Sequence, residues 1–184
     1  SVVNRPGDLD RILAEGLRQT LAVTGLEMGA IGLLDPKDRT LTLQCHQGMS
    51  IGFVAWLEEH LKQKPLNAEI WPEELDFYEE DLSQVHTMLP KQIIEEGFRL
   101  YAEIPLFAEG ILVGVLIVAT QGIHSFSAEE KHLLQAVGHQ LGMAITYARL
   151  RQESLAAERL AAVGRVAASV AHDLRSPLGG ILRS

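Results

Sequence analysis

The chain has 184 residues, enough for one globular domain and one extended element. Hydrophobic residues make up 47% of it and charged residues 22%, which is a globular and not a disordered composition. The formal net charge is −8 and Lys and Arg form no run, which argues against nucleic acid as a partner because phosphate contacts need clustered cations.

The sequence gives no sign of a membrane segment or of secretion. Its longest uninterrupted apolar stretch, Ile111–Ala119, is far shorter than the roughly 20 residues that span a bilayer. No signal peptide is visible, and a single cysteine, Cys45, excludes an intrachain disulfide. We expect a cytoplasmic location. Because the sequence stops at Ser184 inside a helical pattern, we interpret it as part of a longer protein.

The first part of the chain predicts one helix and a hairpin. Apolar residues at helical spacing predict a helix over Leu9–Thr24, and Gly25 ends that pattern. Two strands follow, Met28–Leu34 and Thr40–His46, with turn residues between them.

Cys45 falls in the second of these strands. Apolar and polar residues alternate there, with Leu41 and Leu43 preceding the cysteine at every second position. Because side chains of a strand alternate between its two faces, we expect Cys45 to share a sheet face with the two leucines.

The middle of the chain is less regular. Ile51–Lys62 predicts an amphipathic helix, and residues from Pro65 to about Glu96 predict short helices and loops. Arg99–Leu106 and Ile111–Ala119 then predict a second hairpin. The fold class is therefore α+β, an antiparallel sheet flanked by helices.

A long helix closes the sequence. Ser127 and Glu130 have the spacing of a capping box, and no proline intervenes from there to Arg175. Such a helix would be about 70 Å long, more than a domain of this size can bury, so we expect it to pair with a second copy.

Two coiled-coil seams support this homodimer. The first is made of Val137, Leu141, Ala144, Ala148 and Leu155, and the second of Ala156, Leu160, Val163, Ala167, Val170 and Leu174. Their registers do not join, and the change falls between Arg151 and Ala156. With the second seam facing a partner, His172 points outward.

Two stretches carry a resemblance to a known family. Ala-Ala-Ser-Val-Ala-His172-Asp-Leu-Arg-Ser-Pro-Leu178 resembles the H-box of sensor histidine kinases of two-component systems. The segment from Gly97 to Leu134, with its apolar hairpin and Phe-Ser-Ala-Glu-Glu helix start, resembles the C-terminal half of GAF domains. The resemblance implies a GAF sensor domain over residues 1–148, a helical linker over 149–160 and a truncated dimerisation and phosphotransfer helix over 161–184.

The H-box resemblance implies roles for four residues. His172 would be the phosphoacceptor, and Asp173 its general base and orienting partner. Ser176 stands one turn further, where related kinases carry a Thr or Asn that assists phosphatase activity towards the response regulator. Pro177 lacks a backbone N–H, which predicts a bend near Arg175 or Ser176.

The boxes that bind ATP in these kinases do not occur in this sequence. The resemblance therefore implies that ATP is the cofactor of the full-length kinase at a site outside these 184 residues. This part would accept phosphate at His172 without producing it alone, and a response regulator would be its phosphotransfer partner.

The sensor pocket of GAF domains lies between the sheet and the helices that cover it. We expect these side chains along it: Cys45, His46, Trp56, Trp71, Phe77, Tyr78, His86 and Tyr101. The alternative is that the aromatic residues fill a small core. No metal site is predicted, and the sensor ligand is not readable from the sequence.

Three cofactors are considered for the predicted sensor pocket: bilin, haem and an iron–sulfur cluster. Cys45-His46 is similar to the Cys-His pair of bilin-binding GAF domains, but there the cysteine lies on a helix and loop. Haem would need His46 or His86 as a ligand, and nothing in the sequence positions either. One cysteine cannot supply the ligands of an iron–sulfur cluster unless subunits share it, which leaves a redox role of Cys45 open.

The overall prediction is the sensory and phosphoacceptor part of a histidine kinase. A non-catalytic GAF module that binds a ligand or senses redox state, dimerised by its last helix, is the alternative.

Overall fold

The computed structural model describes residues 7–63, 78–82 and 90–181. The chain divides into two compact units, residues 1–146 and 147–184. The elements of the first unit, in chain order, are α1 (Asp8–Thr24), β1 (Met28–Leu34), β2 (Leu41–Gln47), α2 (Ile51–Gln63), β3 (Tyr78–Asp81), α3 (Lys91–Glu96), β4 (Leu100–Ala108), β5 (Ile111–Thr120) and the first turns of α4 (Ala128–Ile181). The second unit is the continuation of α4.

A five-stranded antiparallel sheet forms the centre of the first unit, in the order β2-β1-β5-β4-β3. Hairpins join β1 to β2 and β4 to β5, and the pairing of β1 with β5 brings the two hairpins together. The second hairpin turns through Glu109 and Gly110, both at positive φ (51° and 78°). The sheet is thus assembled from two local hairpins and one distant pairing.

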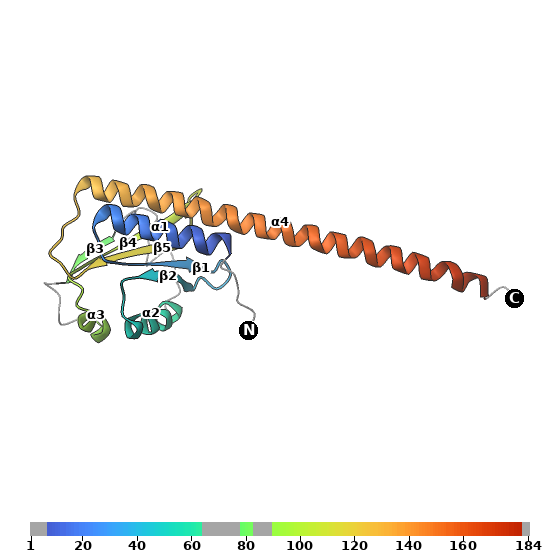
Figure 1. The fold of residues 1–184 in the computed structure, drawn as a ribbon, viewed down its shortest axis with the longest axis horizontal. Coiled ribbons are helices and arrows are strands. Elements are labelled where there is room, and N and C mark those ends of the chain that lie inside the picture. The colour runs from blue at the N-terminus through green and yellow to red at the C-terminus, as the bar shows by residue number, and fades with distance from the viewer. Residues whose placement is uncertain (1–6, 64–77, 83–89, 182–184) are drawn as a thin grey trace. The chain divides into compact units, whose positions relative to one another are not determined.

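Helices cover both faces of this sheet. In Figure 1, α1 and the first part of α4 lie on one face, and α2 and α3 lie on the other. On the first face, Leu13 and Leu17 of α1 and Leu134 and Ile145 of α4 pack in one core with Ile104 of β4. All five side chains are essentially inaccessible to solvent, which accounts for the apolar spacing of both helices.

The opposite face has its own core. Phe53, Leu57 and Leu61 lie four residues apart on α2 and pack against Ala30 of β1 and Val115 of β5. Because β1 and β5 are buried on both sides, they are apolar at nearly every position instead of at every second one.

Two glycines let α4 approach the sheet closely. A Cβ at Gly138 would stand 2.9 Å from Cγ2 of Ile104 and 3.0 Å from the carbonyl oxygen of Pro105. A Cβ at Gly142 would overlap the carbonyl group of Phe107. The helix therefore packs directly on the β4 backbone at a spacing that only glycine permits.

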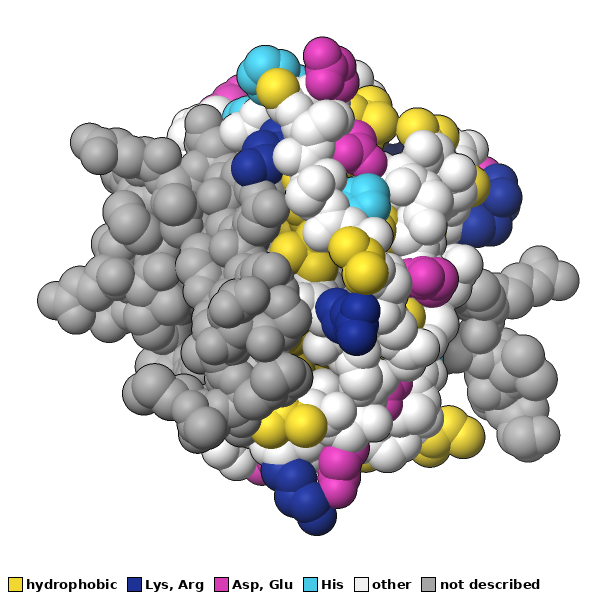
Figure 2. All heavy atoms as spheres, turned by 90° about the vertical axis from the view of Figure 1, so that its left-hand side faces the viewer, with side chains coloured by type: hydrophobic (Ala, Val, Ile, Leu, Met, Phe, Trp, Pro, Cys, Tyr) yellow, Lys and Arg dark blue, Asp and Glu magenta, His cyan; other side chains and the backbone are white. Residues whose placement is uncertain are grey.

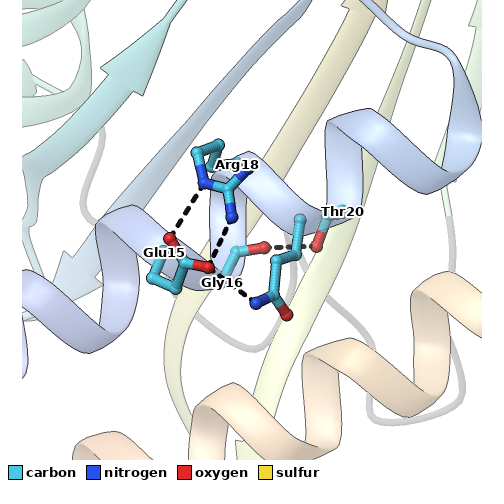
Figure 3. Close-up of polar contacts among 5 residues, drawn as sticks. Glu15, Gly16, Arg18 and Thr20 are labelled. Carbon is cyan, nitrogen blue, oxygen red and sulfur yellow. Dashed lines mark hydrogen bonds and ion pairs between the residues drawn. The ribbon is translucent and has the colours of Figure 1, made fainter.

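Polar side chains of α1 form hydrogen bonds within the helix. Figure 3 shows exposed Glu15 accepting hydrogen bonds from Arg18 (2.9 and 2.6 Å), while the hydroxyl of the buried Thr20 donates to the Gly16 carbonyl oxygen at 2.7 Å. Gln19 also donates to Glu15, and these bonds lower the pKa of the Glu15 carboxyl to about 2. The exposed ion pair keeps this side of α1 hydrated.

The structure confirms the α+β class and the flanked antiparallel sheet, and it adds one strand. β3 lies within the segment predicted as short helices and loops; its sequence, Tyr-Glu-Glu-Asp, shows no apolar alternation, and its pairing with β4 makes it a strand. α4 continues through Pro177 to Ile181. The predicted bend there stays a prediction.

The predicted placement of Cys45 is wrong. The β1–β2 register shifts so that Ile31 pairs with Cys45 and Gly32 with Leu43, which leaves Gln44 as a bulge. A bulge reverses the alternation beyond it. Cys45 therefore packs in the α1 and α4 core, whereas Leu43 packs in the α2 core on the other face.

Candidate functional site

His172 lies in the second unit, on a stretch of α4 that is exposed on all described sides. Its Nδ1 stands 3.6 Å from Oδ1 of Asp173, and the two side chains are 86% and 78% exposed. The distance is too long for a hydrogen bond, so the contact is an ion pair when the ring is protonated. Since Nδ1 is the nitrogen nearer the carboxylate, Nε2 is left as the nitrogen for an external reactant.

Ser176 and Pro177 lie in the helix that contains His172, but their side chains fall outside the described residues. Their roles in phosphatase activity and in a helix bend stay predictions.

Apolar side chains stand exposed along this same stretch. Leu160 is 75% exposed, Val163 65% and Val170 52%, and all three belong to the second predicted seam. A single helix gains nothing by presenting such side chains to water. The stretch is therefore suited to pairing with another apolar helix.

The first predicted seam is different, because part of it is covered by the first unit itself. Leu141 is 6% exposed and belongs to the α1 and α4 core, and Val137 packs against that core. This half of the seam faces its own sheet and α1, and a partner would meet only its outer edge.

A cavity of about 260 Å³ lies between α2, α3 and the sheet in the first unit. We call it the α2 cavity. Its described lining consists of Met49, Phe53, Trp56, Leu57, His60, Leu61, Pro90, Ile93, Phe98, Tyr101, Glu103 and Ile117. None of these is Lys or Arg, and Glu103 is the one carboxylate among them.

Aromatic rings form one wall of the α2 cavity. Phe53 meets Phe98 edge-on with ring centroids 5.0 Å apart, and Trp56 stacks on His60 at 4.6 Å. Phe53 and Phe98 are buried, whereas Trp56 and His60 are partly exposed. The cavity thus has an apolar floor and a polar rim.

Tyr101 and Glu103 complete the rim from β4. They alternate with the core residues Ala102 and Ile104, so the strand turns the first pair to the cavity and the second pair to the other face. Both are partly exposed.

Of the residues predicted along a sensor pocket, Trp56 and Tyr101 line the α2 cavity. Trp71, Phe77, His86 and the side chain of Tyr78 lie outside the described residues. His46 is exposed and does not appear in the lining, and Cys45 lies on the other face of the sheet. The bulge at Gln44 thus turns Cys45 to the face opposite the α2 cavity.

Burial raises the pKa of the Cys45 thiol to about 11, and the nearby Asp10 carboxylate adds to the shift. A thiol with such a pKa is almost wholly protonated near neutral pH, which disfavours its use as a thiolate ligand or redox nucleophile. Among the described residues, no three His, Cys, Asp or Glu side chains come together as a metal site.

His60 and Glu103 are lining residues that the sequence reasoning missed. His60 lies one turn after Trp56 on the predicted helix, and Glu103 is the one acid within an apolar strand. Both signals were visible, since a charged residue inside an otherwise apolar strand commonly faces a functional cavity.

A second hollow, the α1–α4 groove, lies on the other side of the first unit. Gly16, Gln19, Thr20 and Val23 of α1 line it together with Leu133, Ala136, Val137, Gln140 and Leu141 of α4. It is mainly apolar and open, and within it Leu141 packs closely on Gly16, where a Cβ would stand 2.9 Å from the leucine Cδ2.

The described surface in Figure 2 shows Lys and Arg side chains scattered among acidic, apolar and other polar ones. This face carries no basic patch of the kind that holds a phosphate backbone. None of the helices in the described part of the chain combines the length and apolarity needed to cross a membrane.

Residues 7–146 match the sequence profile of the GAF domain family. No curated protein matches the chain. The fold of the chain is similar to a solved domain assigned to a two-component sensor histidine kinase of Sinorhizobium meliloti 1021, with a TM-score of 0.67 and 17% identity over 81% of this chain and 98% of that one.

Two further solved structures are similar. One is the GAF domain of a phosphoenolpyruvate-protein phosphotransferase from Acinetobacter, with a TM-score of 0.60 and 19% identity over 80% of this chain and 87% of that one. The other is a GAF domain assigned to a sensor histidine kinase of Pseudomonas syringae pv. tomato, with a TM-score of 0.58 and 16% identity over 84% of each chain. At such identities the similarity shows the fold alone.

Proposed function

This chain belongs to the GAF domain family, and we propose that it is the sensory and phosphoacceptor part of a two-component sensor histidine kinase. A signal received by the GAF domain would control ATP-dependent phosphorylation of His172 and transfer of the phosphoryl group to an aspartate of a response regulator. The observation that carries the proposal is the exposed His172-Asp173 pair within His-Asp-Leu-Arg-Ser-Pro-Leu, on the helix that begins in the GAF domain.

Exposure of His172 suits two successive reactions with large partners. In the first, Nε2 of the neutral ring attacks the γ-phosphorus of ATP, a nitrogen–phosphorus bond forms, and the bond to the bridging oxygen breaks as ADP leaves. Asp173 lies beside Nδ1 and would take or hold the proton of that nitrogen as positive charge develops on the ring. In the second reaction, the aspartate of the response regulator attacks the same phosphorus and the nitrogen–phosphorus bond breaks. His172 must therefore be accessible first to the catalytic domain that carries ATP and then to the response regulator.

The apolar side chains around His172 support a homodimer through α4. Leu160, Val163 and Val170 are separated by three and seven residues, and a second copy of the helix would bury them. Dimerisation would also set the phosphoacceptor helix of one copy beside that of the other, the arrangement that the kinase resemblance implies.

Phosphorylation by a histidine-kinase catalytic domain tests the function. The chain is mixed with such an ATP-binding domain and γ-labelled ATP, and label on the chain is measured after acid and after alkaline treatment. We expect acid-labile, alkali-stable label on the wild type and none on His172→Gln. His139→Gln is the matched control, because His139 is another exposed histidine on α4 and its loss should leave the labelling unchanged.

Equal labelling of His172→Gln and wild type would refute the phosphoacceptor role. A wild-type chain that takes no label, either from the supplied domain or within its full-length protein, would favour the second candidate function. That candidate is a non-catalytic GAF module that binds a ligand and is dimerised by its last helix. The specific observation in its favour is the α2 cavity, whose aromatic lining could hold a ligand without any phosphotransfer. GAF domains also occur in proteins of other kinds, such as the phosphoenolpyruvate-protein phosphotransferase from Acinetobacter.

A further inference from the structure

Helix α3 is too short to be stable by itself. It has six residues, Lys91–Glu96, and none of these six is buried in the described structure. A helix of fewer than about 12 residues is marginal in water, because its first turn costs more free energy than the few following residues return. Contacts with other elements must therefore hold α3 in place.

The apolar contacts of α3 come from its first half. Pro90, which precedes the helix, and Ile93 belong to the described lining of the α2 cavity, and Ile93 packs against the core on that face of the sheet. Ile93 is only half-buried, however, and Ile94 is 43% exposed. Helix α3 thus covers part of the α2 cavity while burying little apolar surface of its own.

A carboxylate at the end of α3 joins this helix to α2. Oε1 of Glu96 accepts a hydrogen bond from the backbone N–H of Ser50, and Oε2 accepts one from the Ser50 hydroxyl, both at 2.6 Å. Ser50 directly precedes α2, and its Oγ also accepts the N–H of Phe53 at 3.1 Å. Hydrogen bonds to a charged group are about twice as strong as those between neutral groups, and a helix N-terminus favours a negative charge. We call this pair of bonds the Ser50–Glu96 latch.

The Ser50–Glu96 latch lies at the edge of the α2 cavity. Met49 directly before Ser50 and Phe53 one turn after it both line the cavity. Ile93, which lines the cavity from α3, stands one turn before Glu96. The latch therefore holds two walls of the cavity together, and Figure 1 shows α2 and α3 on the same face of the sheet.

Gly97 provides a hinge between α3 and the core. It has a φ of 78°, and its N–H donates to the carbonyl oxygen of Ile94 at 3.0 Å. The next residue, Phe98, is 9% exposed and meets Phe53 edge-on with ring centroids 5.0 Å apart. Over one glycine the chain thus passes from a helix without buried residues to a residue anchored in the core. Hinges are commonly a few residues of this kind at the end of an element.

We propose that α3 is a lid on the α2 cavity, held closed by the Ser50–Glu96 latch and pivoting at Gly97. While the latch is formed, α3 stays against α2 and the edge of the cavity between them is closed. When the latch opens, α3 keeps little apolar contact and moves away from α2, which admits solutes to the cavity. The lid goes beyond the proposed function, because it would gate the cavity of a kinase sensor and of a non-catalytic GAF module alike.

Alkylation of a cysteine placed in the cavity tests the lid. Leu57 lines the cavity and is 6% exposed, so the variant Leu57→Cys carries the reporter thiol, and Cys45→Ser removes the one native cysteine. The rate of reaction with N-ethylmaleimide is measured on the full 184-residue chain at neutral pH. We expect Glu96→Ala to raise this rate about tenfold, the size of one hydrogen bond to a charged group. Because alanine favours a helix at least as well as glutamate, the increase cannot come from a weaker helix propensity of α3.

Two further variants separate the latch from a general effect on α3. Glu95→Ala is the matched control, because it removes the neighbouring carboxylate, which pairs with Lys91 within α3 at 3.0 Å, and it should leave the rate unchanged. Ser50→Asp keeps a good N-cap for α2 but sets a second carboxylate against Glu96, so it should raise the rate as Glu96→Ala does.

A second reporter position detects unfolding of the whole domain. Leu13 is inaccessible to solvent and belongs to the core on the other face of the sheet. The thiol of Leu13→Cys should therefore react at the same slow rate with and without Glu96→Ala.

An unchanged rate at Leu57→Cys in the Glu96→Ala variant would overturn the lid. Equal acceleration at Leu57→Cys and Leu13→Cys would also overturn it, since the whole domain would then be opening. Equal effects of Glu95→Ala and Glu96→Ala would refute the role of the latch. None of these rates depends on phosphorylation of His172, so the lid and the kinase function can fail separately.

Discussion

Replacing Gly142 by alanine would test how closely α4 packs on the sheet. A Cβ built at this position overlaps the carbonyl group of Phe107, which belongs to the β4 backbone and cannot rotate away as a side chain could. Either the helix or the strand must move. The substitution therefore perturbs the closer of the two glycine contacts, at Gly138 and Gly142, through which α4 packs on the β4 backbone.

Two opposing effects determine how much Gly142→Ala changes the free energy of unfolding. Alanine stabilises a helix interior by about 0.8–1 kcal/mol relative to glycine. Forcing an extra methyl group into a close-packed interface costs about 1–3 kcal/mol, and a backbone neighbour places this case in the upper part of that range. We expect a net loss of roughly 1–2 kcal/mol in the free energy of unfolding, and a melting temperature lower by roughly 3–8 °C.

Gly52 provides the matched control. It lies in the first turn of α2, is exposed, and a Cβ there would meet no atom within 4 Å. Gly52→Ala should therefore stabilise the domain by up to about 0.5–1 kcal/mol. Urea unfolding followed by circular dichroism measures both variants. A Gly142→Ala variant that is as stable as Gly52→Ala would refute the close packing of α4 on β4.

Three further outcomes can be checked on the same chain. If α4 forms the proposed dimer, light scattering should show Val163→Glu as a monomer and Val166→Glu as a dimer, because the two valines are 65% and 64% exposed and only Val163 lies on the predicted seam. Ser127→Ala removes the hydroxyl that accepts from the Glu130 N–H at 3.1 Å and should cost about 1 kcal/mol in urea unfolding. The backbone N–H of Ser127 donates to the Glu130 carboxylate at 2.8 Å, remains in this variant, and lowers the pKa of that carboxyl. The stabilisation from this second bond is therefore present above the carboxyl's unfolded pKa and should disappear, in urea unfolding, as the pH falls through its folded pKa. Because the pKa of Cys45 is raised to about 11, iodoacetamide at pH 8 should modify it slowly in the folded chain and quickly in urea, and equal rates would contradict its burial.

Hydrophobic periodicity was sufficient to predict most of the fold. β1 and β5 are apolar runs flanked by turn residues, and α1 and α4 have apolar residues at helical spacing together with a stop or a cap, so their limits follow from local sequence. β3 has no such signal. β3 is a strand because its backbone pairs with β4, and its four polar and aromatic residues contain no pattern that predicts this pairing.

The two candidate sites differ in the same way: one depends on local sequence and the other on strand pairing. The surroundings of His172 are local, because a helix fixes which neighbours share its face, and the direction of the ring relative to the predicted seam follows from spacing and stays a prediction. The α2 cavity depends on register. One bulged residue, Gln44, moves Cys45 to the other face of the sheet, and nothing in the alternation of β2 indicates where the extra residue falls.

Within the GAF domain, β4 contacts both the α2 cavity and α4. Tyr101 and Glu103 face the α2 cavity, whereas Ile104 and the backbone around Phe107 contact Gly138 and Gly142 on the opposite face. Coupling between a ligand and a helix requires an element whose arrangement both of them bias. A ligand that shifts β4 would press its backbone against a helix surface without side chains, where no rotamer change can absorb the displacement.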